Sequence, residues 1–344
     1  MKRSGVLRPV PTTLVGLASL VLIGLFSVPV HAQQEVPLTP VVRGTPAGDD
    51  AEVVVLCPDI AVRPEVYISR GRGGLGLKLA QSGYRVYLVD PWNTSAASDD
   101  GFDGVVSDVW PTIMEKVKQI ANGAPVTFVG HGLCGLLPSA AAAAPRGTAI
   151  PLRWIAMGTR FDFRVVSPAW KDWLAAWDRE ERPLPKLTQR TLLTGLRPAL
   201  GGRASSVPPT LSQDADPLET MYRFYEKSVY REPPRAVVAD VLRWFDSGSM
   251  TSRKGWVDYA DGLGIVQGPA LVLAGMADPV APPEDALYAL ERIPESTGVS
   301  YRLLSRASGH NEEYGHLGML LSRHAAWDVD RVVLAWLRGW KKLP

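Results

Sequence analysis

The sequence has few cysteines, no large excess of positive or negative charge, and only one long hydrophobic run. It holds two cysteines and five histidines in 344 residues, and its formal net charge is +2. No charge run, internal repeat or low-complexity tract is present in the sequence. The chain is long enough for one large α/β domain with an insertion. We expect neither a metal nor another cofactor.

The one long hydrophobic run lies near the N-terminus. Lys2, Arg3 and Arg8 precede an apolar stretch over residues 14–28, and small residues follow it up to Ala32. This pattern predicts a cleaved secretory signal peptide over residues 1–32, and therefore export to the periplasm or the extracellular space. The alternative is an uncleaved anchor, but about 15 apolar residues fall short of the roughly 20 that a membrane span needs. No later segment is long and apolar enough to span.

The charge of the mature chain gives no indication of a nucleic-acid partner. Cleavage after Ala32 removes three positive charges and no negative ones, which changes the net charge from +2 to −1. A near-neutral protein offers nucleic acid no electrostatic attraction. A small-molecule or acyl ligand stays open, and the sequence identifies no protein partner.

Strand-like and helix-like segments alternate along most of the chain. β-branched apolar runs predict buried strands, and segments that stop at glycine or asparagine predict helices. Strands are expected at 51–59, 84–92, 124–130, 152–158, 269–278 and 299–305, and helices at 73–83, 104–123, 133–145, 283–293 and 327–340. The alternation predicts an α/β fold with a mostly parallel sheet and helices on both faces. Ligands bind at the carboxyl ends of the strands in such sheets.

The alternation breaks over residues 160–262, which are rich in Trp, Pro and Arg and lack strand signals. We interpret this segment as an inserted helical cap, with helices at 170–177 and 234–245. The resulting organisation is a signal peptide, an extended leader at 33–50, a core in two parts at 51–159 and 263–344, and the cap between them.

Three tryptophans of the cap, Trp170, Trp173 and Trp177, recur at helical spacing. They either seal the cap onto the sheet or form an acyl-binding wall or lipid-facing surface. The nearby cations are consistent with both interpretations; they are Lys171, Arg179 and Arg182.

The stretch "VTFVGHGLCG" has the shape of a strand that enters a tight turn and then a helix. A nucleophile elbow of the pattern G-x-S-x-G has this shape, with small residues around a strained turn. Counted from the strand end, Gly130 takes the first position and Gly132 the nucleophile position. A register shift would make Cys134 the nucleophile instead, but it requires a longer turn.

Two later loops supply an acid and a base in the order that a nucleophile–acid–base triad requires. Asp278 follows the strand at 269–278 after a turn and is the expected acid. Two histidines follow: His310 in a Ser-Gly loop, and His316 just before an expected helix. We favour His316 as the base and keep His310 as the alternative.

With these motifs in place, residues 51–344 resemble the α/β-hydrolase superfamily, most closely its lipase-like and lysophospholipase-like members and more distantly polyhydroxyalkanoate synthases and depolymerases. The segments that carry the resemblance are "GYRVYLVDPW", "FVGHGLCG", "GPALVLAGMADPVAPPE" and "YGHLGMLLSRHAAWDVDRVVLAWL". The resemblance implies an α/β-hydrolase fold with ester-hydrolase ancestry. It gives little indication of the substrate.

The departures from the family pattern concern the chemistry. Glycine at position 132 leaves no side chain for a covalent intermediate. The resemblance places the oxyanion-hole N–H groups at Leu133 and at Ile60, and relatives usually have glycine where this chain has Asp59. The Asp59 carboxylate either points to solvent or lies beside the hole, where it would raise the barrier.

Three functional hypotheses follow. The protein is impaired or silent as a serine hydrolase and binds an acyl or apolar ligand; or it uses Asp278 and His316 as a general-base dyad on a water above Gly132; or it is a thiol hydrolase through Cys134. If the sheet has the order usual in the family, Cys57 and Cys134 lie on neighbouring strands. They are then either a disulfide or two buried thiols.

Overall fold

The computed structural model describes residues 36–42, 47–68, 74–145, 153–164 and 228–340, together with Lys171 and Ala175. The expected signal peptide and most of the expected cap lie outside the described residues, including Trp170, Trp173, Trp177, Arg179 and Arg182. The predicted boundaries of these two segments therefore stay predictions.

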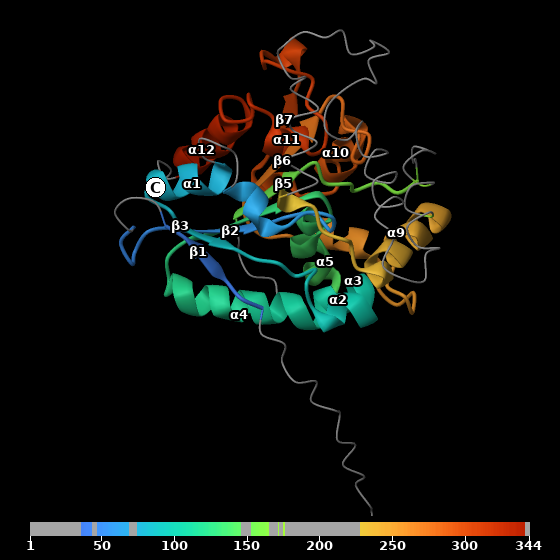
Figure 1. Ribbon diagram of the computed structural model, residues 1–344. Coiled ribbons are helices and arrows are strands. Elements are labelled where there is room, and N and C mark those ends of the chain that lie inside the picture. The colour runs from blue at the N-terminus through green and yellow to red at the C-terminus, as the bar shows by residue number, and fades with distance from the viewer. Residues whose placement is uncertain are drawn as a thin grey trace, which may run out of the picture. The chain divides into compact units, whose positions relative to one another are not determined.

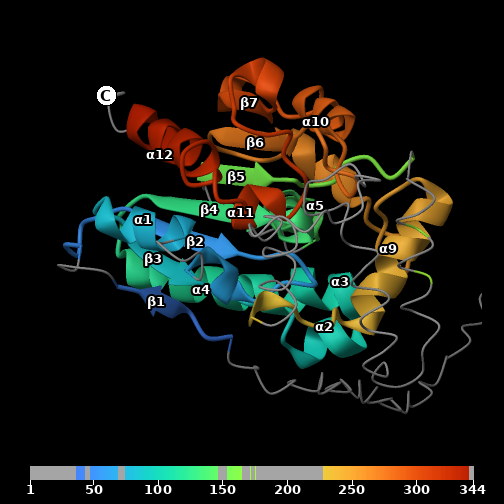
Figure 2. The same ribbon diagram turned by 45° about the horizontal axis from the view of Figure 1, so that its top comes forward.

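The described strands form one seven-stranded sheet with the order β1-β3-β2-β4-β5-β6-β7. All neighbours pair in parallel except β1, which runs antiparallel to β3. Figure 2 shows the strands in this order, from β1 at the bottom to β7 at the top. The strands are β1 (Thr39–Val41), β2 (Val53–Cys57), β3 (Arg85–Leu88), β4 (Val126–His131), β5 (Arg153–Met157), β6 (Ala270–Gly275) and β7 (Val299–Leu304).

Helices cover both faces of the sheet, as the alternation predicts. Figure 1 shows α1 and α12 on one face and α4 on the other. The described helices are α1 (Leu75–Gln81), α2 (Ser95–Asp99), α3 (Gly101–Gly104), α4 (Trp110–Ala121), α5 (Leu137–Ala143), α9 (Arg235–Ser247), α10 (Pro283–Leu290), α11 (Gly318–Leu321) and α12 (Val329–Trp340). Within these ranges no helix is both long and apolar enough to cross a bilayer.

The central strands are buried on both faces because their sequences are continuous apolar runs. Every residue of β2 and of β6 is buried. This pattern is typical of parallel strands that helices cover on both sides. The sheet therefore forms a rigid base from which the loops at its carboxyl edge project.

Helix ends follow the expected stop signals. The helix predicted over 104–123 consists of α4 preceded by a π-helical segment, η2 (Val105–Val109). It ends at Asn122, whose φ of 47° is left-handed and whose N–H donates to the carbonyl of Lys118. The predicted helix at 133–145 begins instead with a 3₁₀ turn, η3 (Gly132–Leu136), before α5.

The leader expected at 33–50 is not purely a leader. Its residues Thr39–Val41 form β1, which pairs with β3 at the edge of the sheet. A run of three residues that includes a proline carries no strand signal of its own, and the pairing partner supplies the structure.

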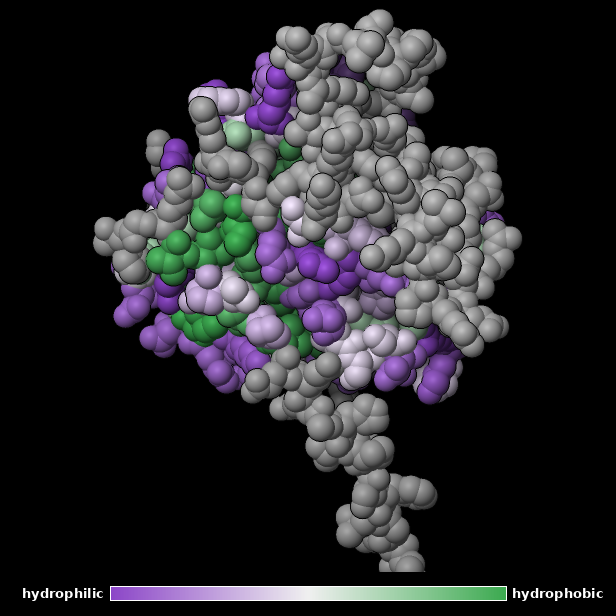
Figure 3. Space-filling model, viewed as in Figure 1, coloured by the Kyte–Doolittle hydropathy of each residue, from purple (hydrophilic) through white to green (hydrophobic). Residues whose placement is uncertain are grey.

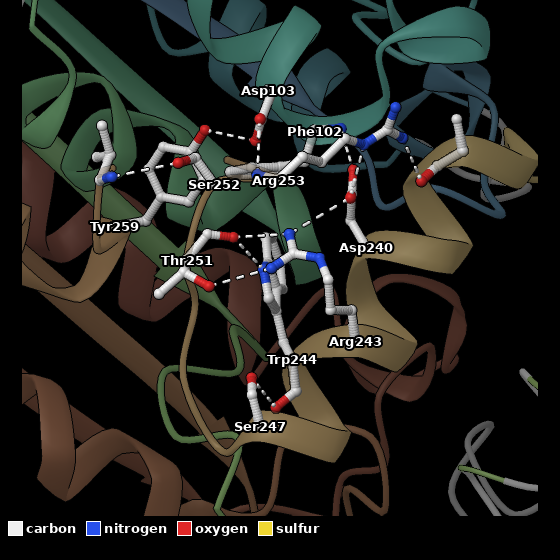
Figure 4. A network of polar contacts seen from close by, with 12 residues as sticks. Phe102, Asp103, Asp240, Arg243, Trp244, Ser247, Thr251, Ser252, Arg253 and Tyr259 are labelled. Atoms are coloured by element: carbon white, nitrogen blue, oxygen red, sulfur yellow. Dashed lines mark hydrogen bonds and ion pairs between the residues drawn. The ribbon is translucent and has the colours of Figure 1, made fainter. Parts of the chain in front are cut away.

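The described part of the expected cap contains α9, which packs against α2 and α3. Asp240 of α9 is buried and accepts hydrogen bonds from Phe102 N at 2.9 Å and Arg253 Nε at 2.9 Å. Figure 4 shows this network, in which Asp103 joins Tyr259 and the backbone of Arg253. The contacts fix the position of α9 relative to the core.

The described surface is of mixed polarity in the view of Figure 3. Hydrophilic residues lie at its centre and rim, and one hydrophobic area lies on the left, in the region where Figure 1 shows α1 and β3.

Candidate active site

The loop after β2 is held by two side chains from elsewhere in the chain. Tyr67 Oη donates to the carbonyl of Cys57 at 2.8 Å, and Trp92 Nε1 donates to the carbonyl of Pro58 at 2.7 Å. Both rings are buried. These bonds fix the backbone on either side of Pro58 and so aim the next residue, Asp59, at the carboxyl end of β4.

The turn after β4 can form because its residues are small. Gly132 has a φ of 57°, in the left-handed region that favours glycine. A Cβ at Gly130 would lie 2.6 Å from the backbone of Cys134, and a Cβ at Gly135 would lie 1.9 Å from Thr159 Oγ1. The strand and the helix that follows it pack as closely as a nucleophile elbow requires.

The position above Gly132 is not vacant, contrary to the sequence-based expectation. The Asp59 carboxylate occupies it, since a Cβ built on Gly132 would lie 2.1 Å from Asp59 Cγ. Of the two orientations considered for Asp59, the structure therefore has the one toward the oxyanion hole. The carboxyl group reaches this place from the loop after β2, one strand away from the elbow.

The two predicted oxyanion-hole donors meet at one oxygen, and that oxygen belongs to Asp59. Ile60 N donates to Asp59 Oδ1 at 2.9 Å, and Leu133 N donates to the same atom at 2.8 Å. The two N–H groups thus converge on one point, and Asp59 Oδ1 already occupies it. A substrate carbonyl cannot enter it while Asp59 holds this position.

His316 lies between two carboxylates. Its Nδ1 is 3.0 Å from Asp278 Oδ2, and its Nε2 is 3.0 Å from Asp59 Oδ2. The other oxygen of Asp278 accepts the N–H groups of Val280 and Ala281. Asp278 and His316 therefore lie together as the acid–base dyad was expected to, and Asp59 is the third member of the group.

Both ring nitrogens of His316 face an acceptor, so both donate, and the ring is an imidazolium. Burial opposes this charge, but Asp278 and Asp59 outweigh it and raise the pKa of His316 to about 10. Burial likewise works against the charge on Asp59, and the hydrogen bond and charge of His316 lower the pKa of that carboxyl below its usual value. At neutral pH the group therefore consists of a cation between two anions.

This protonation state weakens the general-base hypothesis. A base must have a free lone pair, whereas Nε2 of His316 donates to Asp59. The space in which a water was expected above Gly132 is the space that Asp59 fills. In this state His316 is an acid.

The two alternative catalytic residues, Cys134 as nucleophile and His310 as base, are both bound to other partners. Cys134 is fully buried and forms a disulfide with Cys57, with the two Cα atoms 5.9 Å apart. A bridged sulfur is not a nucleophile, which removes the basis of the thiol-hydrolase hypothesis while the bridge is intact. His310 Nδ1 donates to the carbonyl of Ser305 in its own loop, 3.2 Å away.

His131, to which the sequence assigned no role, holds the backbone of His316. Its Nε2 donates to the carbonyl of His316 at 3.0 Å. Burial and then the charge of His316 lower the pKa of His131 to about 3, so its ring is neutral. Its Nδ1 has no hydrogen-bond partner among the described residues.

Asp59, His131 and His316 also offer ligand atoms within 4.8 Å of one another, the one such set found in the described chain. A metal would have to displace the proton on His316 Nε2, which the two carboxylates stabilise. The hydrogen bond between His316 and Asp59 makes these two residues of the set a proton-holding pair. The expectation that no metal or cofactor is needed stays a prediction.

A small pocket that is open to solvent lies over this group. Asp59 and Arg160 are its charged residues, and Arg160 also pairs with Asp285 at 3.3 Å. Two wall residues, Val241 and Phe245, come from α9. The lining residues are Asp59, Ile60, Gly132, Leu133, Gly158, Arg160, Phe163, Val241, Phe245 and Val280.

Gly158, at the end of β5, leaves room for the dyad. Its φ is 54°, and a Cβ there would lie 3.0 Å from Asp278 Oδ2 and 3.1 Å from His316 Nδ1. The sequence marks this residue only as the end of an expected strand.

The sequence matches no protein-family model and no curated protein. Its structure is similar to several solved structures. A hydrolase from Oleispira antarctica has a TM-score of 0.52 at 14% identity, over 88% of this chain and 94% of that one. An esterase from Thermogutta terrifontis has a TM-score of 0.55 at 17% identity, over 88% and 93%.

An esterase from Exiguobacterium antarcticum has a TM-score of 0.56 at 17% identity, over 88% of this chain and 95% of that one. Identities this low speak for the fold and not for a shared activity. The sheet order, the elbow and these neighbours agree with the resemblance read from the sequence: the chain has the α/β-hydrolase fold.

Proposed function

We propose that this protein does not act as a serine or thiol hydrolase, and that it binds a small, neutral, apolar molecule in the pocket above Asp59. One observation carries the proposal: the Asp59 carboxylate lies where a nucleophile's side chain would be and accepts both oxyanion-hole N–H groups. The group has the arrangement that the carboxylate product of ester hydrolysis would adopt, with one oxygen in the hole and the other on the base.

The chemistry of the pocket favours a neutral ligand over a fatty acid. Most of its lining is apolar. Of its two charged residues, Arg160 is already paired with Asp285 at 3.3 Å, whereas the negative charge of Asp59 lies at the base of the pocket. A second carboxylate would be repelled there and would find the hole filled. The sequence left an acyl or apolar ligand open. Of these, we expect a molecule without a free acid group.

The absence of serine-hydrolase activity is tested with a fluorophosphonate probe and a panel of p-nitrophenyl esters. We expect neither labelling nor turnover by the wild type. A double variant, Gly132→Ser with Asp59→Gly, is the positive control, because it restores a hydroxyl and empties the hole. Turnover by the wild type that Cys134→Ala abolishes would overturn this part of the proposal.

Ligand binding is tested by thermal unfolding with hexan-1-ol and with hexanoate. Hexan-1-ol should raise the melting temperature and hexanoate should not. Val241→Trp, which fills the pocket, should abolish the effect, whereas Leu287→Trp on an exposed position of α10 should leave it unchanged. Equal stabilisation by both ligands, or by neither, would contradict the proposed pocket.

Export is the remaining part of the proposal, and it rests on the basic start, the apolar run and the small residues up to Ala32. N-terminal sequencing of the protein recovered from its producing cells tests it. Processing after Ala32 is expected, and an intact Met1 would contradict it.

A further inference from the structure

The Asp59 carboxylate has one acceptor site that no group in the described part of the chain uses. An ionised carboxyl group has about four lone-pair sites, divided between its two oxygens. Oδ1 accepts the N–H groups of Ile60 and Leu133, at 2.9 and 2.8 Å, which uses both of its sites. Oδ2 accepts only Nε2 of His316, at 3.0 Å, so one site on this oxygen is left over.

This acceptor site belongs to the pocket. Asp59 lines the pocket, and its side chain is 12% exposed. Burial opposes the charge on Asp59, but the hydrogen bond and charge of His316 outweigh it and lower the pKa of this carboxyl group. A bound molecule that donates a hydrogen bond therefore meets an ionised acceptor in a largely apolar site, where such a bond is strong.

Four N–H groups of the pocket wall already donate within the protein. Two of them are the N–H groups on Asp59 Oδ1. The other two belong to Gly158, which donates to the carbonyl of Leu273 at 2.9 Å, and to Val280, which donates to Asp278 at 2.8 Å. A ligand whose polar group only accepts, such as an ether, finds no partner at these N–H groups.

The cation of the pocket wall is also engaged. Arg160 Nη1 donates to the carbonyl of Val280 at 2.6 Å, and Arg160 Nε lies 3.3 Å from Asp285. An ammonium ligand would face this cation and would gain little from Asp59, whose charge His316 already balances, while it lost its water. The pocket therefore favours a donor without charge.

We propose that the ligand of this pocket is a small apolar alcohol, whose hydroxyl group donates a hydrogen bond to the free site on Asp59 Oδ2. The inference rests on the proposed binding of a neutral apolar molecule and names the polar group of that molecule. The alkyl chain of the alcohol would contact the apolar wall, which includes Phe163, Val241 and Phe245.

The experiment compares hexan-1-ol with its isomer 1-methoxypentane, an ether of the same composition that has no donor. Isothermal titration calorimetry at pH 7 measures both dissociation constants on the protein with its disulfide intact. We expect the alcohol to bind at least about tenfold more tightly, the factor that one hydrogen bond to a charged group gives. Hexan-1-ammonium chloride should bind more weakly than the alcohol.

Asp59→Asn tests whether Oδ2 makes this distinction. The new amide oxygen should stay on the N–H groups of Ile60 and Leu133, which puts the NH₂ group in the place of Oδ2. One of its N–H bonds then points to His316 Nε2 and the other is left for the ligand, so the ether should bind at least as tightly as the alcohol. Asp261→Asn, at an exposed carboxylate, should keep the preference for the alcohol.

Equal affinity of the wild type for the two isomers would overturn this inference and leave the proposed binding of neutral apolar molecules intact. Tighter binding of the ammonium ion would overturn it too, together with the neutrality of the ligand. If neither isomer binds, the proposed function itself fails. A preference for the alcohol that persists in Asp59→Asn would overturn the role of Oδ2, and if that variant does not fold, the comparison of the isomers on the wild type still decides.

Discussion

The side chain of Asp59 lies directly against Gly132 and leaves no room for a side chain there. The Asp59 carboxylate lies where any side chain at position 132 would begin, with Cγ 2.1 Å from the place of a Cβ. Glycine is therefore required at this elbow by its neighbour as well as by its left-handed φ. Gly132 and Asp59 are two separate departures from the family pattern in the sequence, but in the structure the carboxyl group of Asp59 fills the space that a side chain at position 132 would need.

Gly132→Ser alone should destabilise the protein and gain no esterase activity. The new side chain would overlap Asp59, and overpacking of this kind costs about 1–3 kcal/mol. Urea unfolding measures the loss. In a double-mutant cycle with Asp59→Gly, the destabilisations should not add, because removal of the carboxyl group vacates the space.

The outcome that contradicts this prediction is specific. If Gly132→Ser is as stable as the wild type and hydrolyses p-nitrophenyl acetate, Asp59 turns out of the hole at little cost. The carboxylate would then be a movable occupant of the hole.

His316 should make stability depend on pH above neutrality. Its pKa is about 10 in the folded protein, against 6.5 for a free histidine. Between these values the folded state holds a proton that the unfolded state has lost, so stability falls as pH rises, by about 1.4 kcal/mol per pH unit for one full proton. Below pH 6.5 both states are protonated, and the stabilisation is complete.

The measurement is the difference in unfolding free energy between the wild type and His316→Gln from pH 6 to pH 10. The charged or titratable groups facing His316 are Asp278, Asp59 and His131, and the difference cancels the titration of groups elsewhere. The difference should shrink as pH rises. A difference that stays constant over this range would show that His316 is neutral in the folded protein.

The strands and the tight turn of this site can be predicted from the sequence, but the orientation of the Asp59 side chain cannot. Strands such as β2 and β6 are continuous apolar runs, and the glycines of the elbow mark its turn. The orientation of Asp59 instead depends on the hydrogen bond from Trp92 to the carbonyl of Pro58, 34 residues away in the chain. No local pattern carries that information.

The same limit applies to α9. Its amphipathic pattern predicts a helix, and one is present. Its role in the pocket wall comes from Asp240, which joins it to the backbone of Phe102, a contact between distant segments. A charged residue in a helical pattern reads as solvent-exposed, whereas Asp240 is buried.

Asp240→Ala should lower both stability and ligand affinity. It leaves the N–H of Phe102 and Nε of Arg253 without their acceptor (Figure 4), which costs about 1–3 kcal/mol. The change loosens α9 and with it the pocket wall at Val241 and Phe245. Urea unfolding and the melting-temperature shift with hexan-1-ol measure the two effects.

Asp246→Ala is the matched control on the same helix. Its carboxylate is 67% exposed and pairs with Lys171, and exposed pairs of this kind contribute little. A loss of stability as large as that of Asp240→Ala would mean that the buried network is not what anchors α9.

The disulfide should be a main source of stability beside the site. Cys57 ends β2 and Cys134 lies in the turn after β4, 77 positions further along the chain. Closing a loop of this length in the unfolded chain accounts for about 4 kcal/mol by chain entropy. The double variant Cys57→Ala with Cys134→Ala should lose stability of this order in urea unfolding, and the wild type should lose it in dithiothreitol, whereas the double variant should not respond to dithiothreitol. Thiol titration of the unfolded, unreduced protein should find no free thiol, and two free thiols would contradict the bridge.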